Sequence, residues 1–239
     1  MTTTLAEKIA IVTGGTRGIG RAIAETLLMS GASVAICGRS QGDIDRAVEE
    51  LSAKAAGKVF GGIADVGEPS EVARFFRDVD ERFGRLDVLV NNAGVGIFRN
   101  VSELTVQEWR TVIRTNLDGV FYCCREAIPR MKLAGGGAII NVSSLAGKNP
   151  FAGGAAYNAS KFGLNGFTEA MMLDVRSDNI RVSYVMPGSV DTHFGLNVGG
   201  ASWKIAPQDI ADIVLSILEL PQRTLASRVE VRPSRPEKG

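Results

Sequence analysis

Tyr157 and Lys161 stand four residues apart in the stretch Ala-Ala-Tyr-Asn-Ala-Ser-Lys. On a helix this spacing places both side chains on one face, close enough to interact. A phenol has a pKa of about 10 in water, which is too high for easy proton exchange at neutral pH. A neighbouring ammonium favours the phenolate and lowers that pKa. The pair predicts a tuned proton donor, although the same spacing also occurs on ordinary helix surfaces.

A glycine-rich segment, Gly-Gly-Thr-Arg-Gly-Ile-Gly at residues 14–20, separates a short apolar run from a stretch with apolar residues at helical spacing. The apolar run, residues 8–13, predicts a buried strand of a parallel sheet. A glycine turn between such a strand and a helix lets a pyrophosphate reach the free amides and positive end of the helix. A plain strand–turn–helix connection stays open, because glycine serves any tight turn.

The end of the second predicted strand, residues 33–37, is followed by Gly38, Arg39 and Ser40. In dinucleotide-binding folds an acid about 20 residues past the glycines holds the ribose 2′-hydroxyl, whereas an arginine accommodates a 2′-phosphate. No acid stands at this strand end. Arg17 and Arg39 could both reach a 2′-phosphate, and the Ser40 hydroxyl could donate to it. The alternative, two ordinary surface arginines, is less consistent with their position beside the strand and the glycines.

The chain resembles the short-chain dehydrogenase/reductase (SDR) family, in segments that follow the family's order over nearly its whole length. The matching segments are Thr13-Gly14-x-x-x-Gly18-Ile19-Gly20, Asp65-Val66, Asn91-Asn92-Ala93-Gly94, Asn116, Ser144, Tyr157, Lys161 and Pro187-Gly188. Together they are specific to the family, although none is specific alone. Within the family, the chain is similar to bacterial 3-oxoacyl-[acyl-carrier-protein] reductases.

The resemblance implies four catalytic residues. Tyr157 would give a proton to a carbonyl oxygen during reduction, and Ser144 would hydrogen-bond that oxygen. Lys161 would lower the Tyr157 pKa and hold the nicotinamide ribose, and Asn116 would hold a water that links Lys161 to solvent. Ser143 and Ser144 point to opposite faces at a strand end. The family's serine precedes its tyrosine by thirteen residues, which selects Ser144.

The resemblance also implies a site for NADPH or NADP+, which supplies the hydride chemistry that the protein lacks. Asp65 and Val66 would flank the adenine, and the segment 91–94 would shape the floor of the site. The residues assigned to cofactor binding are Gly14, Thr16, Arg17, Gly18, Ile19, Gly20, Arg39, Ser40, Asp65, Val66, Asn91, Ala93, Gly94, Tyr157, Lys161, Pro187, Gly188, Val190 and Thr192.

Apolar strand candidates alternate with helical stretches along the 239 residues. This alternation predicts an α/β fold, a single Rossmann-type doubly wound domain over residues 1–239 with about seven parallel strands and helices on both faces. The strands are predicted at 8–13, 33–37, 59–63, 86–90, 138–143 and 180–186, with a short one near 228–231. The motif residues fall at the carboxyl ends of these strands, where ligands bind in open sheets.

The segment 191–207 lacks strong periodicity and contains Phe194, Leu196 and Trp203. A loop of this length in a compact domain is usually functional. We therefore expect it to cover the substrate as a lid, with a disordered surface excursion as the alternative. Its apolar character, together with Phe98 and Phe151, favours an apolar or mixed substrate. His193 lies in this segment, but Tyr157 already fills the role of acid.

Composition excludes several other classes of protein. The net charge of +1 implies no affinity for nucleic acid, and no apolar run approaches the length of a membrane span. The first eight residues lack the shape of a signal peptide. Three cysteines without metal-ligand spacing indicate reduced thiols and no metal site. We expect a cytoplasmic enzyme that binds a small-molecule carbonyl substrate.

The leading hypothesis is an NADPH-dependent carbonyl reductase in which Lys161 and Asn116 form the proton relay. A specific alternative is 3-oxoacyl-[acyl-carrier-protein] reductase. Against it, residues 228–239 lack the glycine-rich final strand of those enzymes, and their carrier-docking arginine would fall at Asp178, although Arg130 and Lys132 could still attract an acidic carrier. A second alternative, a non-catalytic dinucleotide-binding regulator, is disfavoured because all four catalytic residues are present.

Two long stretches with apolar residues at helical spacing, 103–131 and 157–175, bear on association. In the family the corresponding helices pair with their copies across a twofold axis. We therefore expect a homodimer or a homotetramer. The residues expected to supply apolar contact are Cys123, Met131, Phe167, Met171 and Met172.

Overall fold

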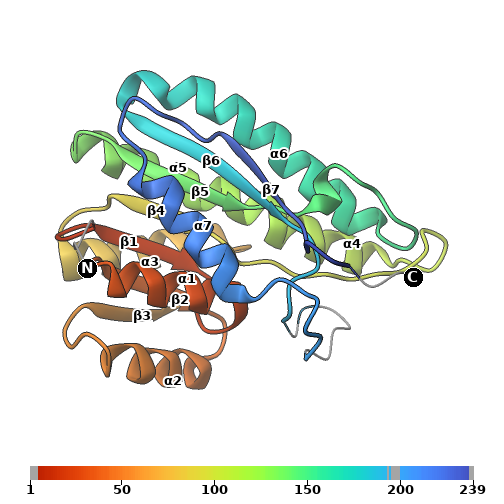
Figure 1. Ribbon diagram of the computed structural model, residues 1–239, viewed down its shortest axis with the longest axis horizontal. Coiled ribbons are helices and arrows are strands. Elements are labelled where there is room, and N and C mark those ends of the chain that lie inside the picture. The colour runs from red at the N-terminus through yellow and green to blue at the C-terminus, as the bar shows by residue number, and fades with distance from the viewer. Residues whose placement is uncertain (1–4, 193, 195–199, 237–239) are drawn as a thin grey trace.

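A parallel sheet forms the centre of the molecule in the computed structural model, which describes residues 5–192, 194 and 200–236. Its strands are β1 (Ile9–Thr13), β2 (Ser33–Gly38), β3 (Val59–Ile63), β4 (Val88–Asn91), β5 (Gly137–Val142), β6 (Ile180–Pro187) and β7 (Arg228–Val231). Their order is β3-β2-β1-β4-β5-β6-β7, and every neighbouring pair is parallel (Figure 1). The predicted seven-stranded doubly wound fold is confirmed.

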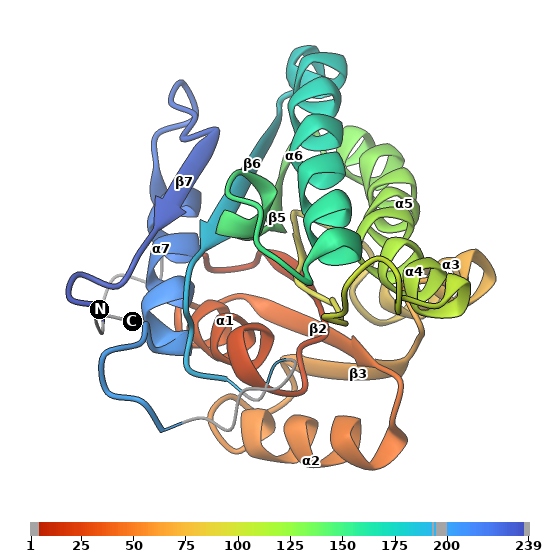
Figure 2. The same cartoon turned by 90° about the vertical axis from the view of Figure 1, so that its right-hand side faces the viewer.

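Helices cover both faces of the sheet (Figure 2). One layer contains α1 (Gly18–Met29), α2 (Gln41–Ser52) and α7 (Pro207–Glu219), and the other contains α3 (Pro69–Phe83), α5 (Gly119–Leu133) and α6 (Ala155–Val175). α4 (Val106–Ile113) leads into α5 through a π-helical turn at Arg114–Asp118. Two short 3-10 helices, Leu145–Gly147 and Arg176–Asp178, lie at either end of α6. No helix among the described residues is both long and apolar enough to cross a membrane.

The central strands are largely apolar because both of their faces are buried; β1, Ile-Ala-Ile-Val-Thr, is buried along its whole length. Successive residues of a strand point to opposite faces. In β1, Ala10 and Val12 therefore pack in the core under α1 and α7, whereas Ile9 and Ile11 pack in the core under α3 and α5. This explains why runs without polar alternation predict these strands correctly.

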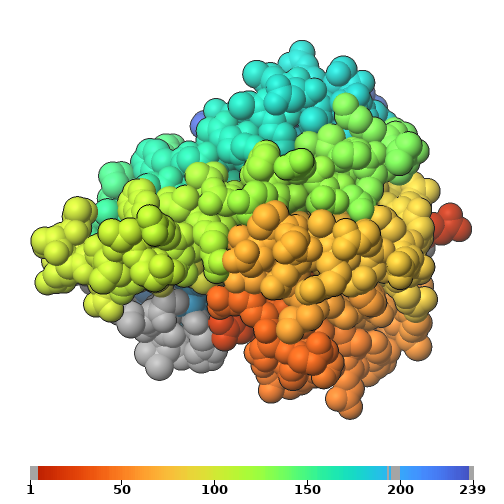
Figure 3. Space-filling view, turned by 180° about the vertical axis from the view of Figure 1, so that it is seen from behind, coloured from red at the N-terminus to blue at the C-terminus, as the bar shows by residue number. Residues whose placement is uncertain are grey.

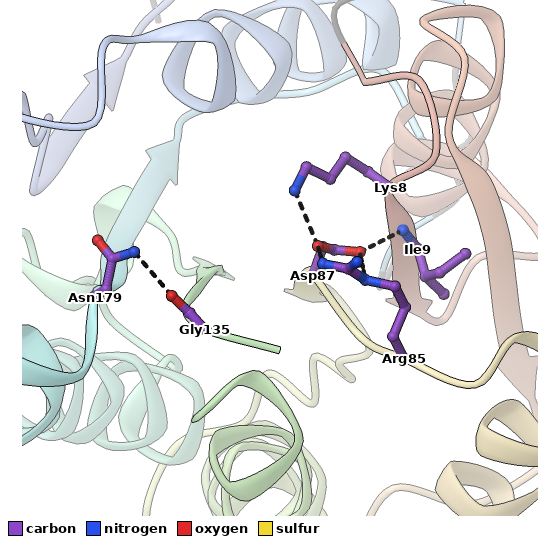
Figure 4. Close-up of polar contacts among 6 residues, drawn as sticks. All are labelled: Lys8, Ile9, Arg85, Asp87, Gly135 and Asn179. Atoms are coloured by element: carbon purple, nitrogen blue, oxygen red, sulfur yellow. Dashed lines mark hydrogen bonds and ion pairs between the residues drawn. The ribbon is translucent and has the colours of Figure 1, made fainter. Parts of the chain in front are cut away.

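The edge of the sheet at the amino ends of the strands is held by polar contacts (Figure 4). The buried carboxylate of Asp87 accepts hydrogen bonds from Lys8 Nζ at 3.0 Å, from Ile9 N at 3.0 Å and from the Arg85 guanidinium at 2.6 and 3.0 Å. Burial alone would raise the pKa of Asp87, but these donors outweigh it and hold the pKa below its usual value. The cluster joins β1 to the start of β4.

The predicted stretch 103–131 is not one helix. Thr105 and Glu108 form a capping box at the start of α4, with Thr105 Oγ1 accepting from Glu108 N at 3.1 Å. A capping box marks a helix start, so the helix begins at Val106 rather than at 103. The π-helical turn then interrupts the stretch before α5.

The two ends of the predicted lid, residues 191–207, are joined to each other beside the end of β6. Asp191 N donates to Ile205 O at 2.8 Å and Ile205 N donates to Ser189 O at 3.0 Å, which closes the base of the segment. Its last residue is the first of α7. His193 and Leu196 lie outside the described residues, so what the sequence predicts for these two residues stays a prediction.

Candidate active site

A cavity of about 800 Å³ opens at the carboxyl ends of the strands, lined by loops that follow β1 to β6. Most of the predicted site residues line it: Gly14, Thr16, Arg17, Gly18, Ile19, Arg39, Ser40, Asp65, Val66, Ala93, Gly94, Ser144, Tyr157, Lys161, Pro187, Gly188, Val190 and Thr192. Gly20, Asn91 and Asn116 are not part of the lining and lie behind it.

Three positions in the turn between β1 and α1, Gly14, Gly18 and Gly20, require glycine for their backbone angles or for lack of space. Gly14 and Gly18 have φ angles of +63° and +56°, which favour glycine. A Cβ on Gly14 would lie 2.9 Å from Ala93 Cα, and one on Gly20 would overlap the Gly14 carbonyl. No side chain caps the first amides of α1. The turn therefore fits a phosphate group, which these amides and the helix dipole would bind.

Asn92 fixes this turn to the end of β4. Its Nδ2 donates to Thr13 O at 3.0 Å and to Gly14 O at 3.2 Å, while Thr13 Oγ1 accepts from Asn92 N and Ala93 N at 3.0 and 3.1 Å. Asn92 lies within the segment 91–94, and the sequence predicts no separate role for it. The only signal for it is an amide side chain directly after a buried strand, because its partner lies 79 residues earlier.

Asn91, its neighbour, was predicted to shape the cofactor floor and lies in the interior instead. Its Nδ2 donates to Asn141 Oδ1 at 2.9 Å, and Asn141 Nδ2 donates to Thr168 Oγ1 at 2.8 Å. The three side chains form a buried row from β4 through β5 to α6. Since adjacent residues of a strand point to opposite sides, only one of the two asparagines can face the turn.

Two arginine side chains, Arg17 in the turn after β1 and Arg39 directly after β2, have no protein partner among the described residues. Arg17 and Arg39 both line the cavity, and neither guanidinium group forms a hydrogen bond or ion pair with another described residue. Ser40 Oγ accepts from Asp43 N at 3.4 Å as the N-cap of α2, so this hydroxyl has a structural role besides the predicted one. Positive charge therefore remains available at this end of the cavity.

Asp65, at the far end of β3, is held by its neighbours. Its Oδ1 accepts from Gly67 N at 2.9 Å, and its Oδ2 pairs with Arg114 Nη2 at 3.1 Å. Val66 packs against Gly119, where a Cβ would lie 2.8 Å from Val66 Cγ2. Both residues are thereby fixed on the cavity wall.

Tyr157 and Lys161 lie on the buried face of α6, one turn apart. Lys161 Nζ donates to Val142 O at 2.9 Å and lies 5.8 Å from the centre of the Tyr157 ring. Burial lowers the pKa of Lys161 to about 8. Burial raises the pKa of Tyr157, and a hydrogen bond with Ser144 opposes that rise. This is the reverse of the expected shift, because desolvation of the phenol outweighs a lysine that is turned toward a carbonyl.

The two serines after β5 have different partners. Ser143 Oγ donates to Asn165 Oδ1 at 2.5 Å and is thereby tied to α6. Ser144 Oγ accepts from Ala146 N at 3.1 Å and lies 3.5 Å from Pro187 O. Ser144, the predicted residue, is the one whose hydroxyl is linked to Tyr157.

Asn116 lies in the π-helical turn and is fully buried. Its Oδ1 accepts from Val95 N at 2.8 Å, and its Nδ2 donates to Val95 O at 2.9 Å and to Ser160 Oγ at 3.1 Å. The side chain thus fixes the loop after β4 to α6. Since both amide hydrogens are used, the expected water would have to be held by an oxygen of Asn116.

Aromatic side chains surround the Tyr157 ring. The ring centres of Phe98 and Phe194 lie 5.6 and 5.7 Å from it, and Phe151 lies 5.7 Å from Phe98. Phe98 and Phe151 are predicted to lie near the lid, but their positions relative to Tyr157 have no signal in the sequence.

Comparison with known proteins agrees with this arrangement of fold and site. The family model described as short chain dehydrogenase matches residues 8–199, and the chain belongs to that family of oxidoreductases. It is 42% identical over 187 residues to the 3beta-hydroxysteroid dehydrogenase of Mediterraneibacter gnavus, covering 78% of this chain and 67% of that protein.

Two further similarities bear on substrate and cofactor. The D-beta-hydroxybutyrate dehydrogenase of Rhizobium meliloti is 40% identical over 188 residues, covering 77% of this chain and 72% of that one. The solved structure of an alcohol dehydrogenase from the archaeon Thermococcus sibiricus, complexed with 5-hydroxy-NADP, superposes with a TM-score of 0.90 at 31% identity, covering 97% of this chain and 99% of that one.

Proposed function

We propose that the protein reduces the ketone or aldehyde carbonyl of a small molecule with NADPH, in a reversible hydride transfer. The observation that carries the proposal is that Tyr157, Lys161 and Ser144 line the same cavity as the uncapped start of α1. A proton donor and a phosphate-binding turn are thus combined in one site. The similarity to named dehydrogenases supports the same reaction class.

NADPH supplies the hydride when it is bound. Tyr157 donates the proton to the carbonyl oxygen, and its raised pKa keeps the phenol protonated at neutral pH. Ser144 donates a hydrogen bond to the same oxygen, where negative charge develops. Lys161, with a pKa of about 8, returns a proton toward Tyr157 and is resupplied through Asn116. The carbonyl carbon thus gains a hydride and the carbonyl oxygen gains a proton, which gives the alcohol.

The preference for NADPH over NADH is assigned to Arg17 and Arg39. Guanidinium groups bind phosphate by parallel hydrogen bonds and stay charged at neutral pH. Both guanidinium groups line the cavity without a protein partner, and Arg39 stands at the end of β2, where an acid would otherwise hold a free 2′-hydroxyl. The archaeal alcohol dehydrogenase complexed with an NADP derivative supports this assignment.

The alternative substrate, an acyl group on a carrier protein, has no support from the surface charges. Lys132 pairs with Asp178 at 2.7 Å, and Arg130 pairs with Asp80 and Glu126 at 2.7 and 2.8 Å. These cations are therefore already neutralised by neighbouring acids. A docking partner with negative charge would have to compete with those ion pairs.

Association into a homodimer or homotetramer is proposed through the outer face of α4, α5 and α6, which Figure 3 shows from outside. Of the residues expected there, Cys123, Met131 and Met171 are buried against the sheet instead, because they face the core side of their helices. The apolar side chains exposed on these helices include Val106, Trp109, Phe121, Phe162 and Leu173. Such a group of apolar side chains is typical of an interface.

Replacement of the phenol tests the proposed reaction. Tyr157→Phe should lower kcat by about 10²–10⁴-fold, because a positioned acid contributes that much. NADPH oxidation is followed with a panel of diketones and β-keto esters, and NADPH binding is measured separately by fluorescence. Tyr122→Phe, on α5 outside the cavity lining, is the matched control and should retain full activity. If Tyr157→Phe keeps more than about a tenth of the wild-type kcat, Tyr157 is not the acid.

A further inference from the structure

Three loops bring phenylalanines together over the proposed acid. Phe98 follows β4, Phe151 follows β5 and Phe194 follows β6, and all three line the cavity. The Phe98 ring meets the Tyr157 ring edge to face, with an angle of 79° between their planes, and Phe194 meets it at 53°. Phe151 packs on Phe98 at 56° and is 46% exposed, so it lies at the mouth of the cavity. A ring entering the site would contact aromatic faces at these geometries.

The close approach of these rings depends on Gly96. A Cβ at this position would lie 2.7 Å from Phe194 Cε1 and 2.8 Å from Phe98 Cζ. A side chain at position 96 would therefore displace one of the two rings. Gly154 has the same effect on Phe151, because a Cβ at position 154 would lie 2.7 Å from the Phe151 ring. The three phenylalanines are therefore packed into position by the backbone beneath them.

Most charged side chains that line the cavity come from the part of the sheet that contains β1, β2 and β3. Arg17, Arg39, Asp43 and Asp65 belong to the loops and helix starts after β1, β2 and β3. In the strand order β2 lies three strands from β5, about 14 Å away at the usual strand spacing. The other charged lining residues among those described are Lys161 and Asp191, which come from α6 and from the segment after β6.

Neither of these two charges is suited to bind a substrate carboxylate. Lys161 is buried and donates to Val142 O, and it is already assigned to the proton relay. Asp191 is an acid, and its Oδ2 accepts from Gly200 N at 3.0 Å. A carboxylate placed beside the reacting carbonyl would lose its hydration without gaining a cationic partner, and Asp191 would repel it.

Building on the proposed function, we propose that the substrate is a neutral carbonyl compound with a ring next to the carbonyl, and that the ring packs among Phe98, Phe151 and Phe194. Compounds with a carboxylate next to the carbonyl are poor substrates. Of the two relatives described above, the steroid dehydrogenase is named for a neutral ring system and the hydroxybutyrate dehydrogenase for a small carboxylate. The cavity of this chain suits the first kind of substrate.

Three related carbonyl compounds separate the effects of ring and charge. With NADPH, kcat/KM is measured for ethyl benzoylformate, for its acid benzoylformate, and for ethyl pyruvate, which lacks the ring. We expect the ester to exceed the acid by about 100-fold, since an unpaired buried charge costs that much or more. We expect it to exceed ethyl pyruvate by about tenfold, the effect of an aromatic contact. Benzoylformate equal to or better than its ester overturns the proposal.

Variants test whether the phenylalanines cause the preference for a ring. Phe98→Leu and Phe151→Leu keep apolar volume but remove the aromatic face, and each should lower the ratio of ethyl benzoylformate to ethyl pyruvate by about 3- to 10-fold. Leu133→Ala, at an exposed position at the end of α5, is the control and should leave the ratio unchanged. An unchanged ratio in both phenylalanine variants, with native circular dichroism, also overturns the proposal.

A binding experiment keeps the inference separate from the proposed function. Saturation-transfer NMR compares acetophenone with benzoate in the presence of NADP+. Binding of acetophenone but not of benzoate supports the aromatic site even if no carbonyl compound is reduced, in which case only the proposed function fails. Binding of benzoate in preference to acetophenone overturns the aromatic site, whatever the turnover measurements give.

Discussion

Arg39 offers the sharpest test of cofactor preference. Arg39 is the residue directly after β2, and its guanidinium lines the cavity without a protein partner among the described residues. A hydrogen bond to a charged group contributes about 1.5–3 kcal/mol, which corresponds to about 10- to 150-fold in affinity. Arg39 is exposed, so solvent screens the interaction and the lower end of that range applies. Arg39→Ala should therefore reduce the preference for NADPH over NADH by about tenfold.

A carboxylate at the same strand end should act in the opposite direction. A Cβ at Gly38 would lie 3.1 Å from Thr16 Cγ2 and 3.7 Å from Ile44 Cγ1, so Gly38→Asp requires only a small shift of the Thr16 methyl group. The new carboxylate repels a 2′-phosphate and accepts from a free 2′-hydroxyl. We expect Gly38→Asp to reverse the preference. Gly42→Asp is the matched control, because a Cβ at Gly42 meets nothing within 4 Å.

The assay is kcat/KM with NADPH and with NADH for wild type and these variants, at low and at high ionic strength. The wild-type preference should weaken as salt rises, because exposed charges are screened. Gly42→Asp should behave as wild type in both cofactors. A wild type that uses NADH as well as NADPH would mean that Arg17 and Arg39 do not bind the 2′-phosphate. The interpretation of this strand end would then be wrong.

Four other measurements test the fold and the site. Gly20→Ala should destabilise the protein by about 1–3 kcal/mol and weaken NADPH binding, since its Cβ overlaps backbone; thermal unfolding and cofactor titration measure both effects. Asp87→Asn should lower the free energy of unfolding by about 1.5–3 kcal/mol at pH 7. Because the pKa of Asp87 is depressed in the fold, its contribution is complete above about pH 4 and is lost as the pH falls further, so denaturant unfolding of variant and wild type should converge in acid. Lys161→Met should weaken NADPH binding at pH 7. It should also remove the decline in NADPH affinity that wild type shows above about pH 8, where Lys161 loses its charge. Cofactor titrations at steps of about one pH unit, from about pH 6 to about pH 9, measure both effects. Sedimentation velocity at micromolar concentration should give a dimer or tetramer, and a monomer there would contradict an interface on α4, α5 and α6.

The sheet could be predicted closely because its strands are buried on both faces. The run before the glycine turn predicts a strand at 8–13, and β1 spans Ile9–Thr13; the run at 33–37 corresponds to β2 at Ser33–Gly38. Even the short strand near 228–231 is found as β7, Arg228–Val231. For β1 and β2, an apolar run between polar turns favours a buried strand of a parallel sheet. β7 is an edge strand, in which charged and apolar residues alternate.

Details that depend on which way a side chain points were not predictable. Asn91 and Asn92 are equivalent by type and position, yet only Asn92 reaches the glycine turn, because the end of β4 sets which of them faces outward. The π-helical turn around Asn116 has no signature in residue type. The direction of the Tyr157 pKa shift depends on burial, which spacing along the chain does not reveal.

The pairing of α1 with α7 has a consequence for synthesis of the chain. Gln208 Nε2 donates to Thr26 Oγ1 at 2.8 Å, across 182 residues, and Ile23 and Leu27 pack in one core with Ile210 and Val214. α1 thus obtains its cover from a helix that is synthesised much later. Until residues 207–219 emerge, the apolar face of α1 stays open to water and to other nascent chains. Native contacts over such separations also form slowly.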